Sequence, residues 1–313
     1  MKHERGLALA AFVTVCIVWG TTYLGIRIAV ETIPPLMLTG IRYVAAGSIM
    51  VLITMLRRDR FPRDPRTLLE LAFIGFLMVG VGNLAVVWAE QWVPSGIAAL
   101  AVATAPFWMV LLELFRTHGE RVDRRGAIGM LIGFAGVAML VTPKGAGGAF
   151  DAHFVAGMIV MQLGSVGWQL GTMRAKYHLK DVAMLPSITL QMLFGGVTVL
   201  AAGIIAGEPA RLRFTPRTAG ALAYLVIFGS VVAYSAYVFA INHMATTKSS
   251  LYAYINPLVA VVLGWVILHE QLTWVSIVAM VVILGGVAMV QSANMARKRA
   301  AAVMAVEVKE NAA

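Results

Sequence analysis

Charged residues are scarce in this sequence. Only 13% of the 313 residues are Asp, Glu, Lys or Arg, whereas 60% are hydrophobic. The mean hydropathy is +0.82. Soluble domains contain roughly 45–50% apolar and about 25% charged residues, so this composition excludes a soluble globular protein and indicates a membrane protein.

Several chemical motifs are also absent. A single cysteine, Cys16, excludes an intramolecular disulfide and a cysteine-cluster metal site. The six histidines are scattered without metal-ligand spacing, and no Gly-Lys-Ser/Thr phosphate-binding loop occurs. A membrane enzyme acting on lipid needs His, Asp or Glu clustered near one membrane face, which this pattern does not provide. We therefore expect no metal, no cofactor, no ATPase activity and no enzyme.

Long apolar runs fill the chain instead. A hydrocarbon core about 30 Å thick requires roughly 20 mostly apolar helical residues to cross it. Each run must be helical, because lipid cannot satisfy backbone polar groups and the short alternating segments of a barrel are missing. Ten transmembrane helices are predicted, at residues 9–30, 36–56, 68–89, 96–115, 126–142, 154–173, 184–206, 218–241, 249–268 and 273–291.

The basic residues indicate the topology of these helices. A net charge of +10 is distributed in short clusters between the apolar runs rather than along one helical face, so we interpret it as a topology signal and expect no nucleic-acid partner. With the N-terminus inside, nineteen Lys and Arg residues lie in inner loops and only four in outer loops. This asymmetry predicts cytoplasmic termini and an even number of helices. Three arginines in the loop 211–217 run against the rule.

The two halves of the chain resemble each other. Pro106 matches Pro257 and Trp19 matches Trp168, and Glu120 matches Glu270. Because each copy holds five helices, the second must enter the membrane upside down, which is the inverted repeat of many secondary transporters. We expect a first repeat over residues 1–143, an external linker over 144–152, a second repeat over 153–292 and a cytoplasmic tail over 293–313.

These features resemble a known family. The segment VWGTTYLGIRIAVETIPPLMLTGIRYVAAG, from Val18 to Gly47, the helices around Pro106 and Pro257, and the His269-Glu270 turn are similar to the EamA-type branch of the drug/metabolite transporter superfamily. The resemblance implies an all-α integral protein of the bacterial inner membrane. It also implies a ten-helix metabolite exporter whose central cavity is formed mainly by helices one, three, four, six, eight and nine.

Polar and aromatic residues within the spans are candidates for lining that cavity, because polar groups in lipid tend to face cavities or one another. Asn83 is suited either to a substrate or to an interhelical hydrogen bond. Pro106 and Pro257 are candidates for gating or for static kinks. The cavity candidates are Trp19, Tyr23, Asn83, Trp168, Gln169, Tyr234 and Tyr252. Packing against lipid or within the protein core is the alternative for the aromatic members.

Charged residues within the spans have simpler interpretations. Arg42 is expected to pair with Glu31, with a substrate carboxylate as the alternative, and Arg27 and Lys176 are expected to anchor helix ends. Glu113 is expected to be salt-bridged or solvated. No Asp or Glu falls at the middle of a span, so the simplest proton-antiport design is missing.

The expected function is export of small metabolites, most simply amino acids or related compounds, by alternating access around the cavity. A multidrug or other metabolite transporter is the alternative, as is a membrane scaffold without transport. The expected partners are a small-molecule substrate and the lipid bilayer.

Overall fold

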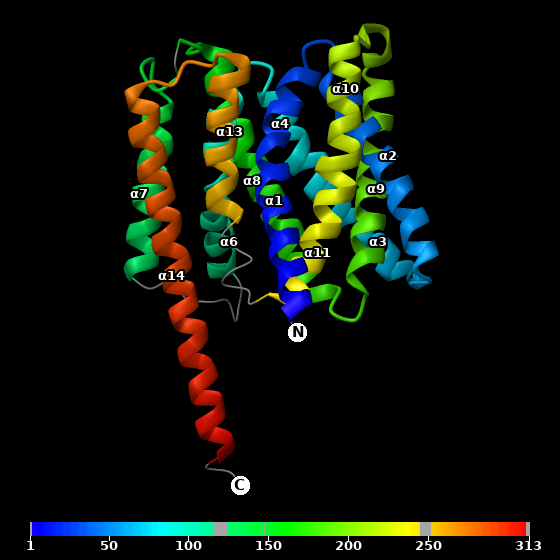
Figure 1. Cartoon of the computed structure of the whole chain (residues 1–313), viewed down its shortest axis with the longest axis vertical. Helices are drawn as coiled ribbons and strands as arrows, with labels where there is room; N and C mark the ends of the chain where they lie inside the picture. The colour runs from blue at the N-terminus through cyan, green and yellow to red at the C-terminus, as the bar shows by residue number, and fades with distance from the viewer. Residues whose placement is uncertain (1, 116–123, 147, 245–251, 311–313) are drawn as a thin grey trace.

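The computed structural model describes residues 2–115, 124–146, 148–244 and 252–310, and these contain helices and turns but no strand. Both ends of the described chain lie at the same end of the molecule (Figure 1). The elements are α1 (Lys2–Ala29), α2 (Pro35–Leu56), α3 (Pro65–Gly75), η1 (Phe76–Asn83), α4 (Leu84–Ala89), α5 (Ser95–Val102), α6 (Ala105–Leu114), α7 (Arg124–Leu140), α8 (Ala152–His178), α9 (Met184–Ile205), η2 (Glu208–Arg211), α10 (Pro216–Tyr224), η3 (Leu225–Val232), α11 (Ala233–His243), α13 (Tyr252–Leu268) and α14 (Trp274–Glu310).

Eight helical segments in the described residues are long and apolar enough to cross a membrane. One runs through α3, η1 and α4 over Pro65–Ala89, and another through α5 and α6 over Ser95–Leu114. Two further helices, α7 and α13, have 17 residues each and overlap the predicted spans 126–142 and 249–268. The multi-pass helical class is thus confirmed. The predicted cytoplasmic tail 293–313 is helical as far as Glu310, because α14 continues without a break, and its cytoplasmic location stays a prediction.

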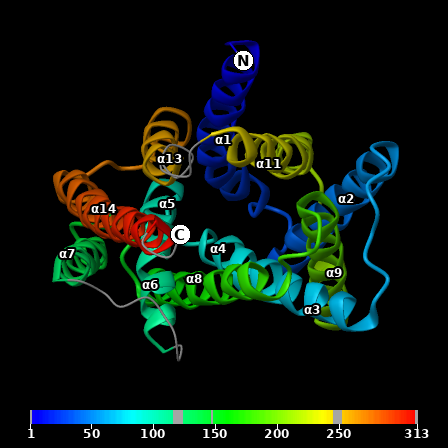
Figure 2. The ribbon, with the colours of Figure 1, turned by 90° about the horizontal axis from the view of Figure 1, so that it is seen from below.

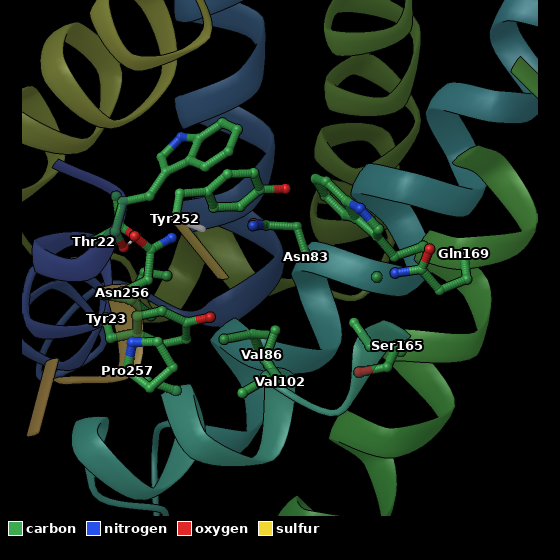
Figure 3. A pocket seen from close by; sticks show the side chains of 18 of the residues that line it. Thr22, Tyr23, Asn83, Val86, Val102, Ser165, Gln169, Tyr252, Asn256 and Pro257 are labelled. Carbon is green, nitrogen blue, oxygen red and sulfur yellow. Dashed lines mark hydrogen bonds between the residues drawn. The ribbon is translucent and has the colours of Figure 1, made fainter. Parts of the chain in front are cut away.

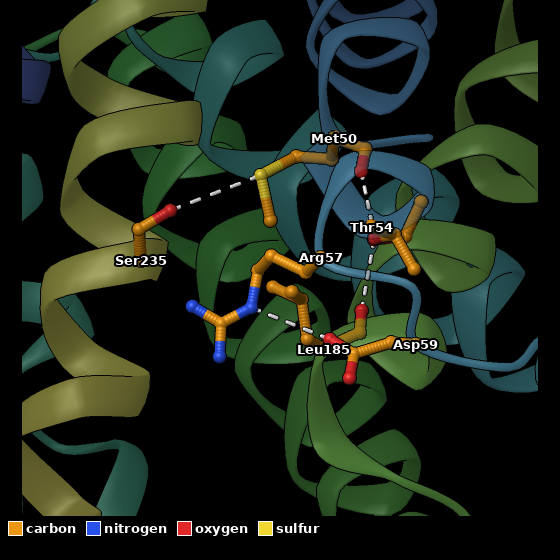
Figure 4. Close-up of polar contacts among 7 residues, drawn as sticks. Met50, Thr54, Arg57, Asp59, Leu185 and Ser235 are labelled. Atoms are coloured by element: carbon orange, nitrogen blue, oxygen red, sulfur yellow. Dashed lines mark hydrogen bonds and ion pairs between the residues drawn. The ribbon is translucent and has the colours of Figure 1, made fainter. Parts of the chain in front are cut away.

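Two helix pairs pack along each other at opposite edges of the molecule, α2 with α9 and α7 with α14 (Figure 2). Between α2 and α9, a Cβ added at Gly40 would lie 2.6 Å from Leu200 Cα. A buried hydrogen bond of 3.1 Å joins the hydroxyls of Thr54 and Thr189 across the same pair, and Thr54 also donates to Met50 O (Figure 4). Small residues let the backbones approach, and hydroxyls then link them.

The α7–α14 pair depends on glycines in the same way. A Cβ added at Gly129 would lie 2.8 Å from Gly286 O, and one at Gly286 would lie 2.8 Å from Gly133 Cα. Gly285 differs from its neighbour, since a Cβ there would meet no atom within 4 Å. Substitutions at these two adjacent glycines therefore test helix packing separately from helix propensity, because only Gly286 contacts α7 closely.

Gly286→Leu is expected to lower the thermal unfolding midpoint of the detergent-purified protein by several degrees. A leucine side chain must push α14 away from α7, and overpacking of this kind costs about 1–3 kcal/mol. Gly285→Leu is the control and should unfold near the wild-type temperature. Unfolding is monitored by fluorescence or light scattering. An equal fall of the unfolding midpoint in both variants would contradict this packing.

The arginine-rich loop before α10 lies against the turn after α1. The Thr32 hydroxyl donates to Arg213 O at 2.8 Å, and Arg217 forms an ion pair with Glu31 at 3.1 Å. The loop therefore shares one end of the molecule with the Glu31 turn, as the predicted ten-helix topology requires. Acidic neighbours offset part of its positive charge. Its position outside the membrane stays a prediction.

Candidate functional site

A cavity of about 390 Å³ lies between the helices of the two halves. It is lined from α1, the α3–η1–α4 run, α5 and α6, α8, the η3–α11 run and α13, and also by Arg42 and Tyr43 of α2 and Gln291 of α14. Every predicted cavity and gating residue lines it: Trp19, Tyr23, Asn83, Pro106, Trp168, Gln169, Tyr234, Tyr252 and Pro257. Their contribution to ligand binding stays a prediction.

One wall of the cavity is an aromatic cluster centred on Trp19. Its ring centroid lies 5.3 Å from that of Tyr234 and 5.3 Å from that of Tyr252, both in edge-to-face geometry. Tyr237 lies 5.2 Å from Trp19 and completes the cluster. Such pairs hold each other in place while offering apolar faces and hydroxyl tips, so this wall suits an amphipathic ligand.

The opposite wall comes from α8 and from the end of η1. Trp168 packs over Gly82, where an added Cβ would lie 3.0 Å from Trp168 Cβ. Asn83 projects between the Tyr252 side and the Ser165–Gln169 side of the cavity (Figure 3). No other described residue hydrogen-bonds the Asn83 side chain, and its Oδ1 is buried. Within the part of the chain that the structure describes, the interhelical hydrogen bond considered for Asn83 is thus not formed, and a role of its amide in ligand binding stays a prediction.

Two π-helical segments border the cavity, one in each half. Asn83 is the last residue of η1, and Gly229 lies within η3. A π-helical turn shifts the following side chains around the helix axis and occurs frequently at functional sites. Nothing in our reading of the sequence predicted these segments.

The prolines occupy different settings. Pro106 lies in the first turn of α6, after a break that separates α5 from α6 at residues 103 and 104. Proline is tolerated there because a first-turn N–H has no helical partner. The Gln162 side chain of α8 bridges the break with two hydrogen bonds. It accepts from Thr104 Oγ1 at 3.1 Å and donates to Ala101 O at 3.1 Å. Pro257, by contrast, lies inside the continuous helix α13.

The charged residues correct one prediction and confirm another. Arg42 does not pair with Glu31, which pairs with Arg217 instead; the rotation of α2 turns Arg42 inward to the cavity, away from the surface turn. Glu113 is salt-bridged, which was one of the two alternatives predicted for it. Its Oε1 lies 3.4 Å from Lys176 Nζ and 2.9 Å from Tyr177 Oη. Arg116, near Glu113 in the sequence, and Glu120 lie outside the described residues.

Arg27 does more than anchor a helix end. Its Nη1 donates to Glu90 O, which joins α1 to the end of α4. Arg27 also lines a second, polar hollow of about 620 Å³ together with Glu31, Gln91, Arg217 and Glu270. This hollow lies at the end of the molecule that carries the Glu31 turn.

Glu90 is a functional candidate that the sequence analysis missed. Its side chain is fully buried, and neither carboxylate oxygen has a hydrogen-bond partner among the described residues. Its main-chain carbonyl accepts a hydrogen bond from Arg27, which lines the polar hollow. Lying at the end of α4, it belongs to the region between the two hollows and lines neither of them.

Comparison with known proteins yields a consistent result. The sequence pattern of the EamA-like transporter family matches residues 6–142 and again residues 155–292. The chain is 38% identical over 294 residues to the uncharacterized inner membrane transporter YedA of Escherichia coli, covering 93% of this chain and 92% of that protein. It is 25% identical over 309 residues to the uncharacterized transporter YvbV of Bacillus subtilis, covering 96% of each. A solved crystal structure at 21% identity shares the fold, with a TM-score of 0.65 over 93% of this chain and 98% of that chain.

Proposed function

We propose, from the fact that this chain belongs to the EamA-like transporter family, that it is a secondary transporter or facilitator exporting small metabolites, such as amino acids or related compounds. Family membership supports a transporter in the inner membrane. The observation that carries the proposal further is the central cavity, which gathers aromatic faces and a few polar groups from both halves of the chain. Ligand sites have this composition.

The cavity's size and lining support a ligand of metabolite dimensions. About 390 Å³ lies within the range of small-molecule sites. Trp19, Tyr252 and Trp168 provide apolar surface, whereas Asn83 and Gln169 provide polar groups. A multidrug transporter or a transporter of other metabolites is the alternative that shares this geometry. A scaffold without transport gains nothing from unpartnered polar atoms facing such a cavity, since these destabilise the fold.

Alternating access by two inverted halves is part of the proposal. Three observations support it: the family pattern matches twice, α2 packs with α9 as α7 packs with α14, and each half contains a π-helical segment bordering the cavity. The N-cap sites Asp64-Pro65 and Thr215-Pro216 also correspond. In this arrangement residues 1–143 and 153–292 are repeats that rock about the cavity, with both termini in the cytoplasm.

Flux through proteoliposomes tests the function. The purified protein should release preloaded amino acids or related metabolites faster than empty liposomes, and Trp168→Ala should reduce that flux by about tenfold, which corresponds to about 1.4 kcal/mol of lost contact. Trp265→Ala is the matched control, because the Trp265 side chain is 57% exposed on α13 and does not line the cavity. Absence of flux across a broad metabolite panel would contradict the proposal.

A further inference from the structure

Arg42 is the only charged side chain among the described residues that line the central cavity. It lies on α2 and is only 3% exposed. No described acidic residue forms an ion pair with it, and its Nη1 is buried without a hydrogen-bond partner. The cavity therefore contains a buried arginine with one side of its guanidinium unsatisfied.

The other side of the guanidinium is fixed. Nε donates to Ser230 Oγ at 3.1 Å, and Cζ lies 4.9 Å from the centroid of the Tyr43 ring. Gly229 leaves room for the group, since a Cβ there would lie 3.4 Å from Arg42 Nη2. The planar fork is held by Ser230 and Tyr43 before any ligand arrives, and a held fork loses little freedom on binding an anion.

An arginine cannot lose its charge at accessible pH, and an unpaired charge away from water is strongly destabilising. Membrane proteins retain such residues where a partner or a ligand satisfies them. Planar carboxylates match the guanidinium fork with two parallel hydrogen bonds. Glu31 pairs with Arg217 and Glu90 does not line the cavity, so a carboxylate brought by a ligand is the partner that fits the cavity.

We propose that the cavity's ligand carries a carboxylate that binds Arg42, while its apolar part lies against the aromatic cluster around Trp19. The inference rests on the proposed function, because it names the chemical class of the transported molecule. It assigns Arg42 as a specificity-determining residue and defines the substrates as amphipathic carboxylates.

One alternative assigns Arg42 a structural role. Glu90, at the end of α4, is a buried carboxylate without a partner, and α2 packs against α4. In that alternative Arg42 and Glu90 balance each other's charge and no ligand is involved. A structural pair is rescued when both charges are removed together, whereas a ligand-binding arginine is not.

The first test needs no substitution. Binding of L-leucine and 3-phenylpropionate to the wild-type protein in detergent is compared with binding of leucinamide and 3-phenylpropanamide by isothermal titration calorimetry. The proposal expects each acid to bind about 10- to 100-fold more tightly than its amide, the range of a lost charge-assisted hydrogen bond. Equal binding of acid and amide, or no binding of either acid, overturns the proposal.

The second test uses variants in proteoliposome flux with the same probes. Arg42→Gln should abolish the preference for the acids, and Arg42→Lys should retain part of it because the charge remains without the fork. Arg57→Gln is the control, since the Arg57 side chain is 68% exposed after the end of α2 and lies outside the cavity, and its acid-to-amide ratio should stay at the wild-type value. The double variant Arg42→Gln, Glu90→Gln should behave like Arg42→Gln; recovery of acid transport in it overturns the proposal in favour of a structural pair.

The carboxylate site and the transport function can be disproved separately. Flux of acids and amides at equal rates in both wild type and Arg42→Gln would leave the transport function standing and remove the carboxylate site. Binding of the acids with the expected preference, but without flux of any probe, would retain the site and remove the transport function.

Discussion

Glu270→Ala is expected to lower the thermal unfolding midpoint of the detergent-purified protein by roughly 5–10 °C, from the loss of about 3 kcal/mol. The Glu270 carboxylate accepts from Ser95 N at 2.7 Å through Oε1 and from Gly96 N at 3.1 Å through Oε2. Those amides begin α5, where the first N–H groups have no helical partner. Ser95 is fully buried, so alanine at position 270 leaves buried donors unsatisfied.

The Glu270 contact also joins the two halves, because α5 belongs to the first and the α13–α14 connection to the second. Glu270→Gln should lose about half as much stability, since one amide oxygen still accepts a hydrogen bond but the charge is gone. Gln271→Ala is the adjacent control and should unfold near the wild-type temperature, because Gln271 is exposed. Unfolding of Glu270→Ala at the wild-type temperature would show that the carboxylate does not stabilise α5.

The spans were predictable because their signal is local. Twenty consecutive apolar residues report membrane depth without reference to any other helix, which is why the predicted ranges overlap the helices observed. The aromatic residues of the cavity were also accessible, because the repeat placed Trp19 and Trp168 at matching positions. Glu270 was singled out by the same repeat, but its contact with Ser95 and Gly96 depends on how the chain packs and carries no sequence signal.

Other features were predicted wrongly or not at all, because they too depend on how the helices pack. Whether Arg42 meets Glu31 or the cavity is decided by the rotation of α2, and a shift of one residue turns a side chain by about 100°. The break between α5 and α6 depends on Gln162 from a helix that is distant in sequence. Composition predicts the helices, but it does not predict which residues contact each other between helices.

Glu90 was not among the predicted functional residues, because nothing in the sequence around it indicates that it is buried. It follows directly after the last residue of the third span, and the residues Gln91, Trp92 and Pro94 that come next are typical of a polar turn. A carboxylate in such a turn is expected to be hydrated. The fold instead closes over it, so a buried acidic group exists although no span has one at its middle.

Burial is the main cause that raises the pKa of Glu90 well above its ordinary value of 4.5, because water no longer solvates the charged form. The Glu270 carboxylate raises this pKa further, whereas Arg27 and Arg42 lower it. The unfolded chain releases the proton near the ordinary value, and the folded protein holds it to higher pH. Between those two values the folded state binds more protons, so its stability falls as pH rises.

Glu90→Gln is therefore expected to flatten the pH dependence of thermal stability. One proton contributes a slope of up to about 1.4 kcal/mol per pH unit within that window, and glutamine keeps the shape of the protonated acid without a charge to desolvate. The variant should match the wild type near pH 5 and exceed it by several degrees near pH 8. Unfolding midpoints measured across this range in the same detergent test it.

The matched control is Glu31→Gln, which removes a carboxylate that is 44% exposed and paired with Arg217. An exposed pair contributes little, about 0–1 kcal/mol, so this variant should keep the wild-type pH profile. If Glu90→Gln also keeps that profile, Glu90 is already ionised in the folded protein and its charge is balanced by Arg27 and Arg42. If the profile flattens, the folded protein carries a proton on Glu90, at the end of α4, in the region between the polar hollow and the central cavity.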